Sequence, residues 1–303
     1  MERNGYITDA EIATAVYLAM TLKKPLLIEG QAGVGKTEIA KVLSSMLDVD
    51  LIRLQCYEGL DVNTSLYEWN YPKQMLRIKM EEHDPRSVAE KESEIFGEEF
   101  LLKRPLLEAI TREDRAPVLL IDEVDRADEE FEAFLLEVLS DFQVSIPEIG
   151  TIKAKHVPYV VLTSNRTREL SDALRRRCLF FWIDYPSFEK EVRVVKAKVP
   201  GINDSLAEQI CLFMQGVRSV RLIKLPGVAE TLDWGLALVS LHRDHLDREN
   251  VRDTMAAFLK DNRDVQKIVG KRLDVLLSAV TSNGKAPGDV VPKMKEQLAA
   301  LES

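Results

Sequence analysis

The stretch Gly30-Gln31-Ala32-Gly33-Val34-Gly35-Lys36-Thr37 decides the fold of this chain. It has the form G-x-x-x-x-G-K-T. A short apolar run at residues 26–28 precedes it, and apolar residues at helical spacing follow it. A strand, this loop and a helix in that order are typical of a phosphate-binding loop. The sequence therefore predicts an α/β fold in which a parallel sheet carries a nucleotide site.

The residue types of the loop explain the chemistry expected of it. Glycines let the backbone turn its amide N–H groups toward phosphate oxygens, and the helix that follows adds the positive end of its dipole. We expect Lys36 to bind the β- and γ-phosphates and Thr37 to bind Mg²⁺ through its hydroxyl. The alternative is a glycine-rich turn that binds nothing. The candidate nucleotide-binding residues are Gly30, Gln31, Ala32, Gly33, Val34, Gly35, Lys36 and Thr37.

An acidic pair follows a second apolar run. Residues 118–121 are all apolar, as in a strand that is buried on both faces, and Asp122-Glu123 come directly after them. At the end of such a strand, Asp122 is expected to hold Mg²⁺ and Glu123 to polarise or deprotonate the attacking water. The alternative is a strand that ends in two solvated acids.

The segments after this pair favour an ATPase. The chain has neither the N-K-x-D string that reads guanine nor the L-S-G-G-Q signature of transporter ATPases. The pattern predicts a helix over 128–142, a β-hairpin over 143–156 and a strand over 159–163. That strand ends in Ser164-Asn165, so Asn165 is the candidate sensor that orients water against the γ-phosphate. The alternative for Asn165 is a turn-forming residue.

Three consecutive arginines follow, at residues 175–177. They could complement the dipole of a short helix and solvate the surface. At this distance after a sensor strand they also match the arginine finger with which oligomeric ATPases reach the γ-phosphate of a neighbouring subunit. Arg177 is the first candidate for this role and Arg176 the second.

Together these motifs resemble AAA+ ATPases of the MoxR family, and segments 55–61, 66–72 and 226–234 resemble its CoxD-like branch. The similarity runs from about residue 8 to about residue 279. It implies an AAA+ core, an αβα sandwich with a parallel sheet, followed by an all-α lid. It also implies a homo-oligomer, a hexameric ring with ATP between subunits. Such proteins act as chaperone-like remodellers that mature or activate metal-containing enzymes, often with a partner that bears a von Willebrand factor A domain.

The chain departs from that family in one respect. MoxR proteins carry a lid arginine, called sensor 2, near the position of Ala229 or Glu230, whereas this chain has no arginine between Leu222 and His242. Lid sensing of the γ-phosphate would then depend on Arg221 or Lys224.

The order of strands and helices predicts two domains. Residues 1–186 form the nucleotide-binding core, with a β-hairpin insert near 143–157. Residues 187–303 read as helices alone, which predicts a helical lid domain and a C-terminal tail.

Composition limits the classes of partner that the chain could bind and the cellular compartment in which it could work. The net charge is −9, which argues against nucleic acid as a partner, because proteins that bind duplexes usually carry a basic surplus. No apolar stretch is long enough to span a membrane. The three cysteines are odd in number and form no C-x-x-C pair, which favours the cytoplasm. Two rival functions stay open: an ATPase that nucleic acid stimulates, and a scaffold whose assembly ATP controls.

Two further segments have a plain structural explanation. Tyr67, Trp69 and Tyr71 alternate at the period of a strand, so we expect ordinary packing of a half-buried strand, with a stacking or client-gripping surface as the alternative. The acidic stretch 81–99 is expected to be an exposed helical face, with a docking surface as the alternative.

Overall fold

The computed structural model describes residues 1, 5–81, 86–281 and 287–301. These form two compact units. The first consists of Thr8–Gly30 and Lys36–Ile183 together with Met1, and the second of Gln31–Gly35, Asp184–Ser303 and residues 5–7, apart from the positions outside the description. The chain therefore passes from the first unit to the second after Ile183, three residues before the predicted boundary.

The first unit is built on a parallel sheet with the strand order β2-β5-β8-β1-β9. Every residue of β1 and of β5 is buried, because helices cover both faces of a parallel sheet. This arrangement confirms the predicted α/β core. The strands are β1 (Leu26–Gly30), β2 (Leu51–Gln55), β5 (Val118–Asp122), β8 (Tyr159–Ser164) and β9 (Leu179–Ile183).

Amphipathic helices cover the faces of the sheet. Helix α2 (Lys36–Leu47) contacts β1, β2, β5 and β8, and α1 (Ala10–Leu22) contacts β1 and β9. Helices α6 (Pro105–Ile110) and α7 (Glu129–Asp141) share one apolar core with Leu27 of β1 and with Leu119 and Ile121 of β5. Helix α7 begins where the Asp128 carboxylate accepts the Phe131 N–H at 2.9 Å.

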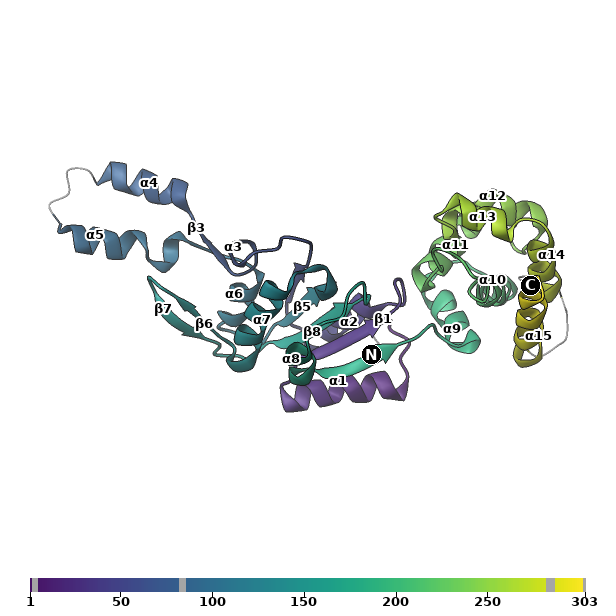
Figure 1. Cartoon of the computed structure of the whole chain (residues 1–303), viewed down its shortest axis with the longest axis horizontal. Coiled ribbons are helices and arrows are strands. Elements are labelled where there is room, and N and C mark those ends of the chain that lie inside the picture. The colour runs from purple at the N-terminus through teal and green to yellow at the C-terminus, as the bar shows by residue number, and fades with distance from the viewer. Residues whose placement is uncertain (2–4, 82–85, 282–286, 302–303) are drawn as a thin grey trace. The chain divides into compact units, whose positions relative to one another are not determined.

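Two segments extend from this core as separate excursions. Strands β6 (Gln143–Ile146) and β7 (Gly150–Lys153) form an antiparallel hairpin at the predicted position. The other excursion follows α3 (Val62–Ser65) and starts from the pair β3 (Tyr67–Trp69) and β4 (Leu101–Lys103). It carries α4 (Tyr71–Met80) and α5 (Val88–Ile95), with a short 3₁₀ turn, η2 (Glu98–Phe100), before β4. Figure 1 shows α4 and α5 side by side beyond β3, at the end of the first unit away from β1.

The three aromatic residues at 67–71 do not share one strand. Trp69 is buried and packs edge-on against Tyr67 and Phe96. Tyr71, however, is exposed and begins α4, so the strand prediction is wrong there. The helix starts because the Asn70 side chain accepts the Lys73 N–H at 3.1 Å and proline stands in the first turn.

The second unit is helical from Phe188 onward in its described residues. Its core centres on Phe213, Trp234 and Phe258, whose ring centroids lie 4.4–5.9 Å apart. The helices are α9 (Phe188–Lys198), α10 (Asp204–Val217), α11 (Val228–Ser240), α12 (Arg248–Phe258), α13 (Asn262–Ile268), α14 (Lys271–Val280) and α15 (Pro287–Ala299).

Candidate functional site

The predicted loop has the backbone that a phosphate site needs. Gly33 and Gly35 have φ of +75° and +92°, a region that side chains disfavour. Gly30 is required for a different reason, because a Cβ there would lie 2.2 Å from the carbonyl oxygen of Ile183 on the neighbouring strand. Lys36 and Thr37 then open α2.

Lys36 is buried inside the first unit. Its ammonium group donates to the Gly30 carbonyl at 2.9 Å and to Asn165 Oδ1 at 2.6 Å. Burial lowers the pKa of this lysine, since the interior disfavours the charged form. Three carboxylates oppose that effect, those of Asp125, Asp122 and Glu123. The carboxylates therefore favour the charged ammonium that a phosphate would bind.

Two threonine hydroxyl groups contact the Asp122 carboxylate at the end of β5. Its Oδ1 accepts the Thr37 hydroxyl at 3.0 Å and also the hydroxyl of Thr163. A carboxylate beside a threonine hydroxyl is the donor set that Mg²⁺ prefers, with the remaining positions left to phosphate and water. No group of three or more His, Cys, Asp or Glu side chains suited to a metal occurs among the described residues. The Thr37 and Asp122 pair thus fits a magnesium ion that reaches the site with a nucleotide.

Glu123 sits in a strained backbone conformation. Its φ and ψ are +56° and +49°, in the left-handed region, and its N–H donates to Thr163 Oγ1 at 2.9 Å. This turn carries its carboxylate toward two amides, Gln55 Nε2 at 3.3 Å and Asn165 Nδ2 at 3.4 Å. Left-handed backbone at a residue with a side chain costs about 1–2 kcal/mol and concentrates at functional sites.

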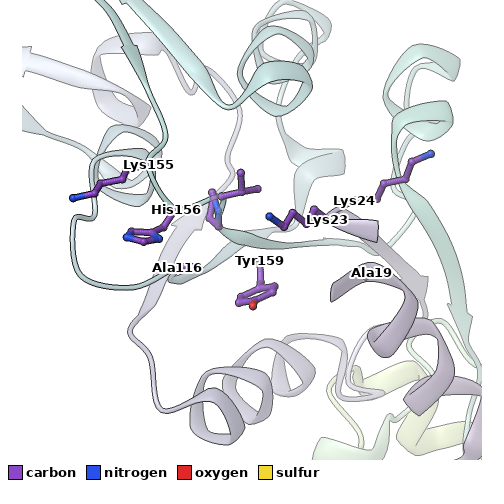
Figure 2. A pocket seen from close by; sticks show the side chains of 9 residues that line it. Ala19, Lys23, Lys24, Ala116, Lys155, His156 and Tyr159 are labelled. Atoms are coloured by element: carbon purple, nitrogen blue, oxygen red, sulfur yellow. The ribbon is translucent and has the colours of Figure 1, made fainter. Parts of the chain in front are cut away.

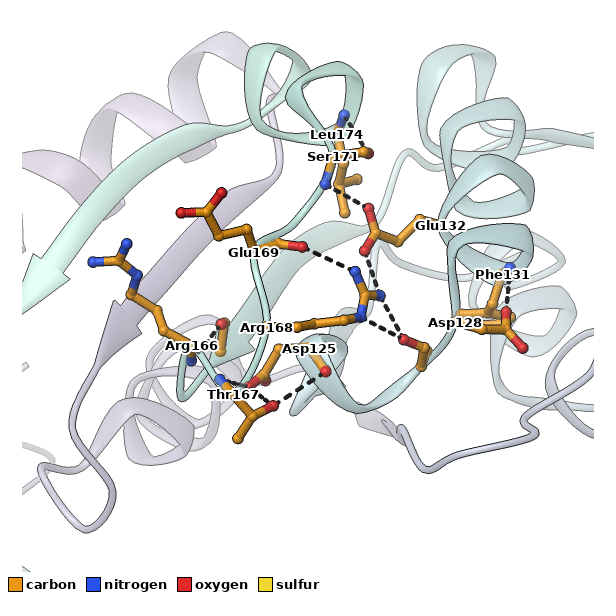
Figure 3. A network of polar contacts seen from close by, with 12 residues as sticks. Asp125, Asp128, Phe131, Glu132, Arg166, Thr167, Arg168, Glu169, Ser171 and Leu174 are labelled. Carbon is orange, nitrogen blue, oxygen red and sulfur yellow. Dashed lines mark hydrogen bonds and ion pairs between the residues drawn. The ribbon is translucent and has the colours of Figure 1, made fainter.

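The backbone of Asn165 is held by the buried carboxylate of Asp125, whose contacts with Thr167 are drawn in Figure 3. Asp125 accepts the backbone N–H of Asn165 at 3.2 Å and both the N–H and the hydroxyl of Thr167, at 2.8 and 2.7 Å. Burial alone raises the pKa of Asp125, but these hydrogen bonds together outweigh burial and hold the pKa below its ordinary value. The loop after β8 is therefore anchored to the turn after β5.

The same loop is tied to the start of α8 (Asp172–Arg177). Arg168 Nη2 forms an ion pair with the buried Glu132 at 2.5 Å, and its Nε donates to the Ala127 carbonyl at 2.9 Å. The other oxygen of Glu132 accepts the Ser171 N–H at 2.8 Å, and Ser171 in turn caps α8 by accepting the Leu174 N–H. Figure 3 shows this chain of contacts from Arg168 through Glu132 to the helix.

The three arginines of α8 have different surroundings. Arg175 forms an ion pair with the buried Glu29 at 3.0 Å. Arg176 and Arg177 are exposed, and Arg177 Nε donates to Ser140 Oγ at 2.7 Å. Within the described part of the chain, neither of these two bonds to the residues around Lys36. The structure thus brings together Lys36, Thr37, Asp122, Glu123 and Asn165 and leaves both finger candidates apart from them.

The sequence did not single out two residues of β2 that complete the site. Arg53 Nη2 pairs with Asp122 Oδ2 at 2.6 Å, and Gln55 contacts Glu123. Both are polar positions at the end of a strand whose register sets Gln55 opposite Asp122. Their alternation with apolar neighbours is a visible signal, but it points to this site only once β2 is known to pair with β5.

In the second unit, an acid lies in the first turn of α11. Glu230 Oε2 accepts the Gly227 N–H at 2.8 Å and so caps α11. The N–H of Ala229 donates to the Gly33 carbonyl at 3.1 Å, a contact within the second unit as the chain divides. The start of α11 thus meets the loop by its backbone and by a carboxylate.

A buried ion pair holds that helix start. Arg218 Nη1 and Nη2 donate to the two oxygens of Glu191, each at 2.7 Å, and both side chains are nearly inaccessible to solvent. Arg218 also donates to Thr231 Oγ1 at 2.8 Å and to the Pro226 carbonyl at 2.8 Å. The turn before α11 is therefore fixed by charge-assisted hydrogen bonds.

A small basic cavity lies at the amino ends of the central strands (Figure 2). It has a volume of about 170 Å³ and is lined by Lys23, Lys24, Lys155, His156 and Tyr159, among others. Figure 2 shows the side chains of Lys24 and Lys155 directed away from one another, so these two lysines do not converge on one ligand. In the described part of the chain, no helix is both long and apolar enough to cross a bilayer.

Comparison with known proteins gives the family. The chain is 26% identical over 228 residues to an uncharacterized protein of Staphylococcus haemolyticus, a match that covers 73% of this chain and 78% of that protein. An uncharacterized protein of Staphylococcus aureus is 26% identical over 221 residues, or 70% of this chain and 75% of that protein. A variant of RuvB from Thermotoga maritima shares the fold, with a TM-score of 0.50 at 17% identity over 93% of this chain and 86% of that chain.

A family model matches more than half of the chain, residues 26–184, which span the sheet and the whole site from β1 to β9. The chain belongs to the ATPase family associated with various cellular activities (AAA).

Proposed function

We propose that this ATPase couples Mg²⁺-dependent ATP hydrolysis to the remodelling of a protein client. One observation carries the ATP chemistry. Lys36, Asn165 and Glu123 form a continuous chain of hydrogen bonds at the carboxyl ends of the strands, beside the Thr37 and Asp122 pair. ATP phosphates, a metal ion and an attacking water all need to meet at such an edge.

Each residue has a role in the proposed mechanism. The loop amides and Lys36 would bind the phosphates, and Thr37 with Asp122 would hold the metal. Bound Mg²⁺ would supply positive charge against the phosphate oxygens. Glu123 accepts a proton from the attacking water, and the amide of Asn165 orients that water. Gln55 and Asn165 hold the Glu123 carboxylate by its two oxygens, which limits its rotation.

The site is completed by a neighbouring subunit in this proposal. Arg177, with Arg176 as the second candidate, reaches the γ-phosphate of the next copy in a hexameric ring. Two observations support it: both side chains are exposed on α8, and neither bonds to the described site residues of its own chain. AAA ATPases generally assemble as rings, so a finger supplied in trans is chemically reasonable.

The client assignment rests on the resemblance to MoxR proteins of the CoxD-like branch. It would make this chain a cytoplasmic, chaperone-like factor for a metal-containing enzyme, acting with a partner that has a von Willebrand factor A domain. The motifs at 55–61, 66–72 and 226–234 support that assignment.

One observation favours a second candidate, a nucleotide-gated scaffold. The lid offers Glu230 where a γ-phosphate sensor would carry an arginine, and this acid is engaged in capping α11. A lid that does not read the γ-phosphate suits a protein in which bound ATP sets assembly only.

A comparison of ATP binding with ATP turnover tests the proposal. The experiment measures both for the wild type and for Glu123→Gln, alone and with a purified metalloenzyme precursor as client. Remodelling predicts turnover that the client stimulates and that Glu123→Gln abolishes. Client maturation that proceeds equally well with Glu123→Gln would favour the scaffold.

A further inference from the structure

The first of the three arginines on α8 is directed into the protein. Arg175 Nη1 lies 3.0 Å from Oε1 of Glu29, and only about a third of the arginine side chain is exposed. Arg176 and Arg177, in contrast, are exposed. The proposed function uses the second and third arginines and leaves the pair of Arg175 and Glu29 without a role.

Glu29 is a buried carboxylate near the end of β1. Its side chain is 2% exposed, and it directly precedes Gly30 of the phosphate-binding loop. Arg166 Nε lies 3.6 Å from Glu29 Oε2, an oxygen that accepts no hydrogen bond from the described residues. Apolar side chains often replace a buried ion pair with no loss of stability. Stability alone therefore does not explain an acid at this position.

An aromatic ring makes a second contact with Arg175. The guanidinium carbon lies 5.2 Å from the centre of the Phe180 ring on β9. In the parallel pairing of β1 with β9, Phe180 lies opposite Leu27, two residues before Glu29. Residues two apart in a strand share a face, so Glu29 and Phe180 lie on one face of the sheet. Arg175 is thus held by a charge on β1 and by a ring on β9.

These contacts set the direction of the other arginines. Arg175 and Arg177 are two positions apart on α8, so they point about 200° apart around the helix axis. Arg175 is directed toward β1, and Arg177 contacts α7. The start of α8 is fixed separately, because Glu132 accepts the Ser171 N–H at 2.8 Å. The pair of Arg175 and Glu29 therefore fixes the rotation of the helix at its other end.

The sensor loop depends less on Glu29. Arg166 follows Asn165, but its Nε stays 3.6 Å from Glu29 and its side chain is about half exposed. Asp125 anchors that loop through hydrogen bonds to Asn165 and Thr167. Removal of the Glu29 charge should therefore disturb α8 more than the sensor.

We propose that Glu29 is a positioning residue for the arginine finger. Through Arg175 it holds α8 in the orientation from which Arg177 reaches the nucleotide of the neighbouring copy. This inference rests on the proposed function, because it needs a site that two copies share. Loss of Glu29 should then lower turnover at the neighbour's site rather than at the site of the altered chain.

The test mixes two full-length variants that should each be inactive alone. Arg177→Ala keeps the site residues but offers no finger, and Glu123→Gln offers a finger but has no general base. Turnover in this parent mixture comes from Arg177→Ala sites that a Glu123→Gln copy completes. Glu29→Gln is then added either to the finger donor, Glu123→Gln, or to the site donor, Arg177→Ala. Steady-state phosphate release against ATP concentration gives kcat and KM.

The effect should depend on which variant carries the change. In the finger donor, Glu29→Gln should lower kcat about tenfold or more, because a displacement of about 1 Å can cost 10²-fold in rate. KM for ATP should stay within about twofold, since the completed site keeps its own loop and lysine. In the site donor, Glu29→Gln should leave kcat within about twofold of the parent mixture.

Arg112→Met in the finger donor is the matched control. Arg112 is also about one-third exposed and forms ion pairs with Asp50 at 3.0 Å and Glu108 at 2.9 Å, both outside the site. This mixture should turn over ATP as the parent mixture does. Circular dichroism confirms that each variant is folded.

Variants of Arg175 test the same pair from its other side. In the finger donor, Arg175→Met should lower kcat about as much as Glu29→Gln, and both changes together should cost no more than either alone. Arg175→Lys keeps a positive charge beside Glu29 and should retain more turnover than Arg175→Met. Equal losses for Lys and Met would make Arg175 itself the group that touches phosphate, and would overturn the positioning role of Glu29.

Two further results would overturn the proposal while leaving the shared site intact. Glu29→Gln in the finger donor could leave kcat unchanged, or it could lower kcat equally in either donor, as a merely structural residue would. A parent mixture without turnover is a different result. It would contradict the shared site, and with it both the proposed function and the positioning of a finger.

Discussion

The ammonium group of Lys36 donates a 2.6 Å hydrogen bond to Oδ1 of Asn165, which stands 129 positions later in the chain. The lysine proposed to bind phosphate and the asparagine proposed as the sensor are thus in direct contact. The same asparagine side chain offers its amide to Glu123 at 3.4 Å. In the proposed mechanism, a phosphate that binds Lys36 competes with this hydrogen bond, and its loss would free the Asn165 side chain beside Glu123. Phosphate binding and the positioning of water would then be linked through Asn165.

Substitution of the general base should separate binding from hydrolysis. Glu123→Gln keeps the shape of the side chain but cannot accept a proton, and its single carbonyl oxygen can accept from only one of Gln55 and Asn165. ATP affinity should stay within about twofold, while turnover falls at least tenfold, since losses of a general base run about 10² to 10⁴. Equilibrium binding of a fluorescent ATP analogue and steady-state phosphate release measure the two quantities. Unchanged turnover would remove Glu123 from its assigned role.

Arg53 should compete with Mg²⁺ for Asp122. Its guanidinium lies 2.6 Å from Asp122 Oδ2, and its side chain is about half exposed. Asp122 is buried, but solvent around the half-exposed guanidinium screens the pair, which we take to be worth up to about 1 kcal/mol. Arg53→Met should therefore lower the Mg²⁺ concentration for half-maximal ATP binding about two- to fivefold. A Mg²⁺ titration of the fluorescent analogue gives this value. Arg252→Met, an exposed arginine of α12, is the control. An equal or higher Mg²⁺ requirement for Arg53→Met would contradict the competition.

Asp125 should make stability depend on acid pH. Its hydrogen bonds to Thr167 and Asn165 hold the pKa below the ordinary value even though burial raises it. A lowered pKa means that the stabilisation is complete above the pKa of the unfolded chain, about 3.9, and is lost as the pH falls through the folded value. Asp125→Asn should therefore cost about 1–3 kcal/mol at neutral pH.

The difference in the free energy of unfolding between Asp125→Asn and the wild type should become smaller below about pH 4. Urea unfolding at neutral and acid pH measures it. A difference that stays constant with pH would show that the charge of Asp125 is not what stabilises the loop.

The buried ion pair of Arg218 and Glu191 in the second unit should show a large coupling energy in the free energy of unfolding. Arg218→Met leaves the Glu191 carboxylate buried without its partner and should cost about 3–5 kcal/mol. Adding Glu191→Gln removes the stranded charge and should recover much of that loss. Urea unfolding of the two single variants and the double variant closes the cycle. Additive losses would mean that the pair contributes no coupling energy.

Sequence reasoning found the residues that combine a motif with the end of a strand. Asp122, Glu123 and Asn165 stand at the ends of apolar strands, and Lys36 follows such a strand through the glycine loop. Parallel strands end at one edge of a sheet, so the meeting of these residues could be expected. Arg53 and Gln55 could not be found this way. They belong to the site only because β2 lies beside β5. The local pattern of apolar and polar residues does not determine the order of strands in a sheet.

Two other features show where local patterns fail. Tyr71 continues an alternation that suggests a strand, yet Asn70 and Pro72 start a helix there, a capping signal that outweighs the alternation. The Arg168 and Glu132 pair joins segments far apart in sequence, and no spacing rule relates them.

The most direct test of a shared site is the steady-state ATPase rate against protein concentration, for the wild type, for Arg177→Ala, for Glu123→Gln and for the two variants mixed. An exposed arginine that completes the neighbour's site predicts activity per chain that rises with concentration. It also predicts that the mixture recovers turnover that neither variant has alone. Activity independent of concentration, with a mixture as inactive as its parts, would contradict the ring ATPase and favour the scaffold.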